Sequence, residues 1–429
     1  MMIKGRDVIF ISSIDWDDQW QAPQEIALRL TKAGNRILYI ENTGIRAPGL
    51  RDARRIKRRL KHWSGALLRR RGVRKVLPDL GVLGPLVLPP FGPSLLSHLN
   101  RQLLLRLIGG AARSMGMRDP LIWTFLPTDT TLGLIDLFSS PHGRVIYYCA
   151  ADFTQLTTSA QRLARSEAEL VRRSDVVFTI CEELAVHCRR WNDNVHVFPY
   201  GVNLNAFPLQ DAGMARPHGS ERESFAWAAR THANGRNGHR VIGYVGGLHR
   251  HVGVDMLVEM ARARPSWSWV FVGSPEVPLK ELAELPNVYL LGQRPHRELA
   301  GYIRTFDVCI VPYRRSAYTE TVVPSKINEY LAMGKPVVST NLPPVCEFND
   351  EHQVLVTAED RPESFLRAID HTLSQGEDEA LIARRHAAAR QGDWEARLEA
   401  MSRLILGGRV DTRGARADLD ADDKVEMVS

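Results

Sequence analysis

The residues best suited to chemistry in this sequence are a lysine and a glutamate three positions apart, Lys326 and Glu329. Ser325 predicts the cap of a helix that begins beside the lysine, and Gly334 with Pro336 predicts its end. Both side chains then share one helix face, near the end whose free N–H groups attract anions. The ammonium group suits a diphosphate, and the carboxylate one turn deeper suits a ribose diol. A capped surface helix with an internal ion pair is the alternative interpretation.

The length and composition of the chain are typical of a globular protein with two or three domains. It has 429 residues, of which 44% are hydrophobic and 24% charged. The five cysteines are odd in number and form no Cys-x-x-Cys pair, which indicates a reducing compartment. The first apolar run is too short for a signal peptide, and no apolar run reaches about 18 residues. We therefore expect a cytoplasmic protein without a membrane-spanning helix.

A basic segment runs from Arg51 to Lys75, and its apolar residues, among them Trp63, recur at helical spacing. The apolar and nearly uncharged segment 80–96 follows it. This combination predicts peripheral contact with an anionic surface, at the inner face of the cell membrane. A solvated basic helix is one alternative. A nucleic-acid site is another, but the stacking aromatic residues that it needs are scarce, so we expect no nucleic-acid partner.

Apolar segments with the length of strands alternate with helical patterns twice along the chain. This is the βαβ rhythm of parallel, doubly wound sheets, and it predicts an α/β fold. In the first half, strands are expected at 7–12, 36–40, 121–125, 144–148, 176–180 and 195–198, and helices at 22–33, 159–173 and 182–191. In the second half, strands are expected at 241–245, 269–272, 288–291, 308–311 and 336–340, and helices at 254–264, 297–305, 362–373 and 379–406.

The pattern divides the chain into two Rossmann-like domains. Residues 1–205 form the first and 241–395 the second, with 206–240 as a polar linker or insertion and 396–429 as a helix end and disordered tail. Parallel sheets bind ligands outside the carboxyl ends of their strands. We therefore expect four segments of the second domain to face one crevice: Gly246-Gly247, Gly273-Ser274, Gly292-Gln293 and the residues after Pro312.

Motifs in both halves resemble those of a known group of enzymes. Segments 242–247, 285–292, 300–308 and 324–340 are similar to the nucleotide-sugar-binding half of a GT-B-fold glycosyltransferase, in particular glycosyltransferase family 4. Segments 15–17, 20–24, 145–153 and 199–203 are similar to bacterial cell-surface polysaccharide transferases of the teichuronic-acid and xanthan type. The resemblance implies two domains that face a central crevice. It also implies transfer of a sugar from a nucleoside diphosphate to a glycan or lipid-linked acceptor hydroxyl.

The resemblance also implies roles for individual residues of the second half. Lys326, as a catalytic residue, and the helix start at Ser325 would hold the departing diphosphate, and Glu329 would hold the ribose. Gly246 and Gly247 would let the backbone approach the phosphates. The turn with Gly292, Gln293 and Arg294 would border the base.

No metal or other cofactor is implied besides the donor, because cationic residues and amides can neutralise the leaving group. The letters Asp15-Trp16-Asp17 match an Asp-x-Asp metal motif, but they lie in the other half of the chain.

The sequence departs from the family pattern at two places. Relatives often carry Arg and Lys where this chain has Gly247 and Val252, so Arg250 and His251 are candidates to compensate the charge. Relatives also carry paired glutamates separated by seven residues. Counting back from the second glutamate leads to Thr321 with Glu320 beside it, and either could contact the donor sugar. The identity of the sugar and the stereochemical outcome stay open.

Candidates from the first half would contact the acceptor. Asp152 follows a predicted strand and could act as a general base, or only orient the acceptor if the leaving phosphate takes the proton. It could instead cap the next helix. Asp15, Trp16 and Gln24 follow the first strand and are expected to contact the acceptor. Trp16 and Trp20 could stack on sugar rings or simply pack.

Two other functions remain compatible with these residues. One is a GT-B-fold nucleotide-sugar epimerase, against which the basic segment argues because such an enzyme needs no lipid-binding region. The other is a non-catalytic nucleotide- or glycan-binding protein, against which the presence of both Lys326 and Glu329 argues.

Overall fold

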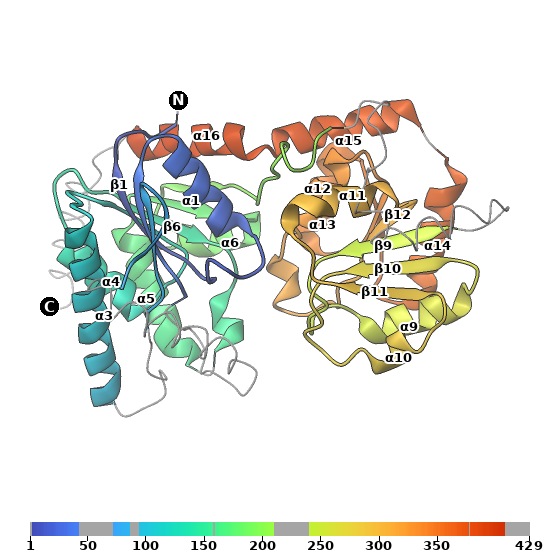
Figure 1. Ribbon diagram of the computed structural model, residues 1–429, viewed down its shortest axis with the longest axis horizontal. Helices are drawn as coiled ribbons and strands as arrows, with labels where there is room; N and C mark the ends of the chain where they lie inside the picture. Colours follow the sequence, from blue (N-terminus) through green and yellow to red (C-terminus); the bar gives the residue numbers. More distant parts are fainter. Residues whose placement is uncertain are drawn as a thin grey trace, which may run out of the picture.

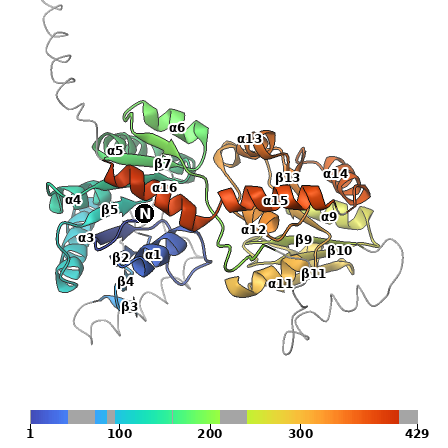
Figure 2. The same cartoon turned by 90° about the horizontal axis from the view of Figure 1, so that it is seen from above.

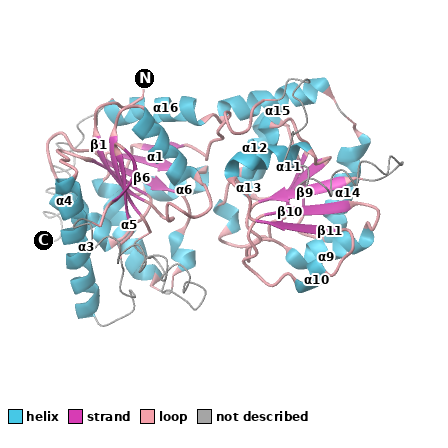
Figure 3. Ribbon diagram, viewed as in Figure 1, coloured by secondary structure: helices cyan, strands magenta, loops and turns pink. Residues whose placement is uncertain are grey.

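The computed structural model contains two α/β domains that lie side by side (Figure 1). It describes residues 2–42, 72–85, 94–157, 159–209, 240–376 and 378–407. Most of the predicted basic segment, residues 51–71, lies outside these ranges. In each domain the strands lie inside and helices cover them, as Figure 3 shows. The α/β class expected from the sequence is confirmed.

The first domain is built on an eight-stranded sheet with the order β3-β4-β2-β1-β5-β6-β7-β8. All neighbouring strands are parallel except β3 and β4, which form an antiparallel hairpin. The middle strands are continuous apolar runs because helices cover both faces of the sheet. The strands are β1 (Asp7–Ile11), β2 (Arg36–Ile40), β3 (Arg74–Leu77), β4 (Leu80–Leu83), β5 (Leu121–Thr124), β6 (Val145–Cys149), β7 (Val176–Thr179) and β8 (Val195–Val197).

The hairpin of β3 and β4 corrects one expectation. Leu80–Leu83 was expected in a membrane-facing segment, but all four residues are buried in the sheet, where β4 pairs with β2. The apolar character of these residues therefore reflects core packing. The helices of this domain are α1 (Ala22–Lys32), α3 (Ser94–Ser114), α4 (Asp129–Leu137), α5 (Ala160–Arg173) and α6 (Glu182–Arg189), with the 3-10 turn η2 (Phe153–Leu156). Within the described ranges, no helix is long and apolar enough to cross a membrane.

The second domain is built on a six-stranded, all-parallel sheet with the order β11-β10-β9-β12-β13-β14. The order reverses between β9 and β12, and such a switch point is where doubly wound sheets bind ligands. The strands are β9 (Val241–Val245), β10 (Ser268–Val272), β11 (Val288–Gly292), β12 (Val308–Val311), β13 (Val337–Thr340) and β14 (Val356–Ala358). The helices are α9 (Val254–Ala263), α10 (Lys280–Ala283), α11 (Leu299–Arg304), α12 (Lys326–Ala332), α13 (Pro343–His352), α14 (Pro362–Ser374) and α15 (Glu379–Gln391), with 3-10 turns η3 (His296–Glu298) and η4 (Thr319–Thr321).

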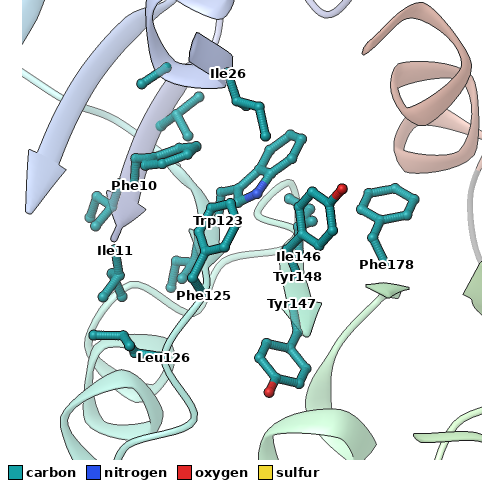
Figure 4. Close-up of a cluster of buried hydrophobic side chains, with 14 of the residues drawn as sticks. Phe10, Ile11, Ile26, Trp123, Phe125, Leu126, Ile146, Tyr147, Tyr148 and Phe178 are labelled. Atoms are coloured by element: carbon teal, nitrogen blue, oxygen red, sulfur yellow. The ribbon is translucent and has the colours of Figure 1, made fainter. Parts of the chain in front are cut away.

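Aromatic side chains fill the centre of the first domain (Figure 4). The rings of Phe10 and Trp123 stack with centroids 5.9 Å apart, and those of Phe125 and Tyr148 with centroids 5.1 Å apart. Four residues from the end of the described chain belong to the same core: Trp394, Leu398, Met401 and Ile405.

The prediction of one long helix over 379–406 is wrong. The chain breaks at Gly392 and Asp393, and α16 (Trp394–Leu406) crosses back to pack on the first domain. The Asp393 carboxylate caps the new helix by accepting from the Glu395 N–H at 3.2 Å. Figures 1 and 2 show α15 over the second domain and α16 over the first. Part of the segment expected as a helix end and tail thus completes the first domain.

The two chain crossings between the domains run side by side. The Val202 N–H donates to the Gly392 carbonyl oxygen at 2.8 Å, and the Trp394 N–H donates to the Val202 carbonyl oxygen at 3.1 Å. Gly201 makes this approach possible, because a Cβ there would lie 2.7 Å from the Gly392 carbonyl oxygen. The connection between the domains is therefore a paired strand contact rather than a single tether.

Candidate functional site

The loop after β9 holds Gly246 and Gly247, here called the glycine loop, at the switch point of the second sheet. Gly246 has a φ of +138°, a conformation that favours glycine strongly. Gly273, after β10, packs so close that a Cβ there would lie 1.8 Å from the Gly246 carbonyl oxygen. A side chain at Gly246 or Gly273 would therefore clash with the present neighbours of the loop.

Two buried tyrosines brace the glycine loop from within the domain. The Tyr244 hydroxyl donates to the Gly247 carbonyl oxygen at 3.0 Å. The Tyr330 hydroxyl oxygen accepts from the Val245 N–H at 2.8 Å. Tyr330 lies on α12, so this bond ties the helix that carries Lys326 to the glycine loop.

Lys326 lies directly beside the glycine loop, as the sequence predicts. Its Nζ donates to the Tyr313 hydroxyl oxygen at 2.6 Å and sits 4.9 Å and 5.3 Å from the ring centroids of Tyr313 and Tyr244. Its Cε lies 2.9 Å from where a Cβ of Gly246 would be. Within the described ranges, the Lys326 ammonium group forms no ion pair with a carboxylate. Aromatic rings and a hydroxyl thus hold a charged group that an anion could neutralise.

The helix start at Ser325 differs from the prediction. Ser325 occupies the cap position of α12, but its backbone is helical (φ −55°, ψ −29°) and its side chain makes no capping hydrogen bond. The first turn is closed instead by the Ile327 N–H, which donates to the Pro324 carbonyl oxygen at 3.1 Å. The Ser325 hydroxyl therefore has no role in capping this short helix.

Glu329 lies one turn deeper on α12 and faces a histidine that the sequence reasoning missed. His296 Nε2 lies 3.6 Å from Glu329 Oε1, and the Phe207 ring packs edge-on against the imidazole at 5.1 Å. The Glu329 side chain is 18% exposed. His296 follows the turn with Gly292 and Arg294, where Gly292 has a φ of +69° and Arg294 is exposed. His296 thus links two predicted parts of the nucleotide site. It follows the turn expected to border the base, and it lies beside the carboxylate expected to hold the ribose.

The loop after the glycines carries two histidines that contact tyrosine rings, His249 at Tyr313 and His251 at Tyr318. His249 contacts the Tyr313 ring with centroids 5.4 Å apart. Burial and the charge of Lys326 lower the pKa of His249 to about 3, so its ring is neutral near pH 7. Arg250, expected to compensate charge, is exposed and its Nε donates to His251 Nε2 at 3.1 Å. His249 therefore adds no second positive charge beside Lys326.

Glu320 and Thr321 both lie on η4, away from the roles considered for them. Glu320 Oε1 lies 3.7 Å from an Arg315 nitrogen, and both side chains are nearly half exposed. Thr321 is buried and its hydroxyl donates to the Tyr318 carbonyl oxygen at 3.1 Å. The ion pair of Glu320 and the side-chain hydrogen bond of Thr321 are therefore made with neighbouring residues of the chain and not with the glycine loop.

Asp152 follows β6 at the carboxyl edge of the first sheet and caps η2. Its carboxylate accepts from the Thr154 N–H at 3.0 Å, from the Thr154 hydroxyl, and from Gln155 Nε2 at 3.2 Å. The capping alternative weighed from the sequence is therefore present in the structure. Among the described residues, the carboxylate oxygen that accepts from Gln155 has only this one donor, so it keeps acceptor capacity for a further hydroxyl.

The structure places the predicted acceptor residues after β1 in the protein interior. Trp16 is 8% exposed and its ring packs edge-on against Trp20 and Tyr39, which is the packing alternative. Gln24 is fully buried, and its amide donates to the carbonyl oxygens of Asp15 and Gln19 at 3.2 Å each. Direct contact of Gln24 with an acceptor is therefore incorrect, because its role is to hold the 15–21 loop. Asp15 is likewise buried.

The Asp-x-Asp letters do not form a metal site. Asp17 pairs with Arg74 at 2.9 Å, and Asp15 points into the interior. Across the part of the chain that the structure describes, no three His, Cys, Asp or Glu residues are grouped so as to hold a metal ion.

Loops of the first domain contact the second domain directly. Gln19 Nε2, after β1, donates to Ser274 Oγ after β10, and the Cys181 thiol, after β7, donates to the Thr321 carbonyl oxygen at 3.6 Å. The carboxyl edges of both sheets therefore face each other, as expected. Sequence reasoning missed Gln19 because contacts between domains leave no local pattern.

Comparisons with known proteins agree with this arrangement. Residues 239–375 match the family model described as Glycosyl transferases group 1. The chain is 35% identical over 158 residues to TuaH of Bacillus subtilis (strain 168), a protein named as a putative teichuronic acid biosynthesis glycosyltransferase. That match covers 36% of this chain and 40% of TuaH, so it spans less than half of either protein.

Solved structures with low sequence identity share the whole architecture. Sucrose-phosphate synthase from Thermosynechococcus elongatus matches with a TM-score of 0.65 at 17% identity, over 93% of this chain and 98% of that one. HepE from Anabaena, solved with UDP, matches with a TM-score of 0.62 at 14% identity, over 94% and 99%. WaaG, a glycosyltransferase involved in lipopolysaccharide biosynthesis, matches with a TM-score of 0.59 at 13% identity, over 94% and 100%. The chain has the GT-B fold, which confirms the predicted fold.

Proposed function

We propose that this protein is a glycosyltransferase. Its GT-B fold and the match of residues 239–375 to the family model Glycosyl transferases group 1 support this proposal. The protein would move a sugar from a nucleoside-diphosphate sugar to an acceptor hydroxyl in the synthesis of a cell-surface polysaccharide. The observation that carries the proposal is the Lys326 ammonium group, held beside the glycine loop at the switch point of the second sheet. The partial likeness to TuaH supports the polysaccharide role.

In the proposed reaction, Lys326 stabilises the diphosphate as it leaves the sugar. The bond from the anomeric carbon to the phosphate oxygen breaks, and the bond to the acceptor oxygen forms. Negative charge grows on the departing phosphate, where a cation about 4 Å away gains about 4 kcal/mol at an effective dielectric constant of about 20. The Tyr313 hydroxyl holds the ammonium group in place before the charge appears. Stabilisation of this kind favours the transition state over the bound substrate.

The nucleoside end of the donor would lie toward Glu329. This carboxylate can accept hydrogen bonds from a ribose diol, and His296 Nε2 lies 3.6 Å from it. The turn with Gly292 and Arg294 would border the base. HepE, which shares the fold, was solved with UDP and UDP-glucose, so a nucleotide sugar is a suitable class of ligand to test.

The acceptor would approach from the first domain, near the loop after β6. Asp152 belongs to this loop, and its neighbour strand β7 leads to Cys181, which contacts the second domain. We propose Asp152 as the group that orients the acceptor hydroxyl, and as its base if the transfer inverts the anomeric centre. Replacing Asp152 with Asn would separate these roles. A lost base would lower kcat with a steep change in the pH profile, whereas lost orientation would mainly raise KM for the acceptor.

Catalysis without a divalent metal is part of the proposal, because Lys326 and backbone N–H groups can neutralise the diphosphate. We expect turnover to be unchanged by an excess of EDTA. A loss of activity that added Mg²⁺ or Mn²⁺ restored would contradict this part of the proposal.

A face of α3 supports peripheral placement at the inner surface of the cell membrane. Leu99 and Leu103 are 55% and 52% exposed one turn apart, and the exposed residues Arg106 and Arg113 continue the same helical face. Leucines that enter the acyl boundary beside arginines at the phosphates suit an anionic lipid surface. This face adds to the predicted role of the segment from Arg51 to Lys75.

Sedimentation with vesicles that contain phosphatidylglycerol tests this placement. Replacing Leu99 and Leu103 with Ser should weaken binding by roughly tenfold, because two exposed apolar side chains are lost. Replacing Leu406, which is 49% exposed on α16, with Ser is the matched control and should change nothing. Equal binding of both variants and the parent chain would contradict a membrane role for this face.

Labelled nucleotide sugars incubated with the full chain and membranes test the proposed reaction. We expect a labelled lipid or glycan product, and we expect Lys326→Ala to lower kcat/KM by at least about 100-fold, as loss of one oxyanion donor does elsewhere. Lys280→Ala, at an exposed lysine of α10, is the matched control. Epimerisation of the sugar of the nucleotide sugar, without a labelled lipid or glycan product, would indicate the epimerase. Full turnover of Lys326→Ala would exclude the proposed diphosphate role.

A further inference from the structure

Three polar side chains meet beside Gly247, on the side of the glycine loop that faces the first domain. Glu276 Oε1 lies 2.5 Å, and Gln19 Nε2 3.2 Å, from the position that a Cβ of Gly247 would take. Gln19 Nε2 donates to Ser274 Oγ, which lies 3.5 Å from Glu276 Oε1. Gln19, Ser274 and Glu276, here called the crevice trio, thus draw on both domains. The sequence predicted that Ser274 faces the crevice, but its motifs singled out neither Gln19 nor Glu276.

The backbone fixes the position of Glu276. The Leu248 N–H donates to the Ser274 carbonyl oxygen at 2.9 Å, and the Glu276 N–H donates to the Leu248 carbonyl oxygen at 3.0 Å. These two bonds form an isolated parallel β-bridge between the loops after β9 and β10. The Glu276 side chain therefore starts from a rigid position beside the glycine loop, although it is exposed to the crevice.

Hydrogen bonds within the first domain fix the position of Gln19. The buried Gln24 amide donates to the Gln19 carbonyl oxygen at 3.2 Å, and the Gln19 N–H donates to the Asp18 carboxylate at 2.9 Å. The side chain that crosses to Ser274 is therefore presented by a pinned loop. The crevice trio is held from both sides of the crevice.

The two glycines of the glycine loop have neighbours of opposite charge. Lys326 lies against Gly246, whereas Glu276 lies against Gly247. In the proposed function, the diphosphate of the donor lies at the glycine loop, and the ribose of the donor points toward Glu329 on α12. The sugar is the other end of the same molecule and must face the first domain, where the acceptor approaches. The crevice trio occupies that side.

We infer that Glu276 selects the donor sugar, accepting hydrogen bonds from the hydroxyls of a neutral sugar and rejecting a uronate sugar. This inference rests on the proposed function. A hydroxymethyl group can donate to a carboxylate, but a sugar carboxylate cannot donate and carries the same charge. Ser274 and Gln19 supply a hydroxyl and an amide that can pair with further sugar hydroxyls. Glu320, the carboxylate considered from the sequence, lies 3.7 Å from Arg315 instead.

Matched pairs of nucleotide sugars that differ only in the sugar carboxylate test the inference. Binding of UDP, UDP-glucose and UDP-glucuronate, and of GDP, GDP-mannose and GDP-mannuronate, is measured by titration calorimetry with the full chain. For the base that the protein accepts, we expect the uronate to bind about tenfold or more weakly than its neutral partner, since like charges a few ångströms apart repel even when partly solvated. The nucleoside diphosphate alone reports any effect of Glu276 on the phosphates, an effect that is common to both sugars of a pair and cancels in their ratio.

Glu276→Gln is the decisive variant, because it keeps the shape and removes the charge. We expect it to improve uronate binding by about tenfold and to bring the two sugars of the pair within about threefold of each other. Glu281→Gln makes the same charge change on α10, which packs against α9 and β11, and should leave the ratio as in the parent chain. Gln19→Ala should weaken both sugar nucleotides and leave the nucleoside diphosphate unchanged.

Results that contradict the inference are distinguishable from results that contradict the proposed function. Equal binding of the neutral and uronate partners to the parent chain would show that no selection occurs. An unchanged ratio in Glu276→Gln, or an equal loss of nucleoside diphosphate binding and melting temperature, would show that Glu276 only supports its loop. Absence of binding by every nucleoside diphosphate and nucleotide sugar tested would instead overturn the proposed function itself.

Discussion

At the scale of single residues, the Tyr313 hydroxyl controls where the Lys326 charge sits. Tyr313→Phe keeps the ring beneath the ammonium group and removes the hydrogen bond of 2.6 Å. A hydrogen bond to a charged group contributes about 1.5–3 kcal/mol, so we expect kcat/KM for the donor to fall by roughly 10- to 100-fold. Steady-state kinetics measures this effect. An unchanged melting temperature shows that the fold is intact, and unaltered kinetics would mean that Lys326 needs no such support.

His249 makes the stability of the second domain depend on pH. The unfolded chain protonates this residue near pH 6.5, whereas burial and Lys326 lower its folded pKa to about 3. The unfolded state thus binds more protons between these values, so stability is complete above about pH 6.5 and falls as the pH drops toward 3. Between pH 7 and pH 5, we expect the free energy of unfolding to fall by about 1–2 kcal/mol less in His249→Gln than in the parent chain. Urea unfolding at both pH values provides the measurement, and parallel losses would contradict the assignment.

At the scale of elements, the glycine loop depends on a backbone conformation rather than on a side chain. Gly246→Ala forces a φ of +138° on a residue with a Cβ, which would also meet Lys326 Cε at 2.9 Å. We expect a loss of about 1–3 kcal/mol in stability together with loss of donor binding. Gly376→Ala is the control, because its φ is +68° and no atom lies within 4 Å of the added Cβ. It should cost about 1–2 kcal/mol and leave binding at the glycine loop unchanged.

The sequence predicted elements well where a pattern was local. Strands such as Val241–Val245 and Val308–Val311 are short apolar runs, and their order along the chain was enough to predict parallel sheets. The break between α15 and α16 carried a local signal, Gly392 followed by Asp393, that the strong helical pattern on either side concealed. Strand β4 was misread because an apolar run looks the same whether it faces lipid or a neighbouring strand.

The candidate site was predictable only in part, for a related reason. Lys326 and Gly246 were found because each belongs to a contiguous motif with its own backbone requirement. Gln19 and Glu276 were not, because they become neighbours only when two domains meet. Gln24 was misassigned because a polar residue after a strand end can serve a ligand or its own loop, and only burial decides between the two.

At the scale of the whole molecule, α16 is a structural part of the first domain. Leu398 is fully buried in the core of that domain, although it follows the entire second domain in the chain. We expect Leu398→Ala to destabilise the first domain by about 2–5 kcal/mol, as cavity-forming substitutions do. Hydrogen exchange should therefore accelerate in α1, which packs on α16, and not in β9.

Leu406→Ala is the matched control for this prediction. Leu406 lies on the same helix and is 49% exposed, so its loss should change stability by no more than about 0.5 kcal/mol. Faster exchange in both domains of Leu398→Ala would mean that the domains unfold as one cooperative unit.

The return of α16 also sets the order in which the protein can mature on the ribosome. The first domain is interrupted by residues 202–393, which must all be translated before Trp394 and Leu398 emerge to close its core. At about 5–20 residues per second, the nascent first domain waits roughly 10–40 s with an apolar face uncovered. The second domain, continuous in sequence from residue 202 to 391, can fold during that interval. The usual vectorial order of synthesis is thereby reversed: the domain that is made first is completed last.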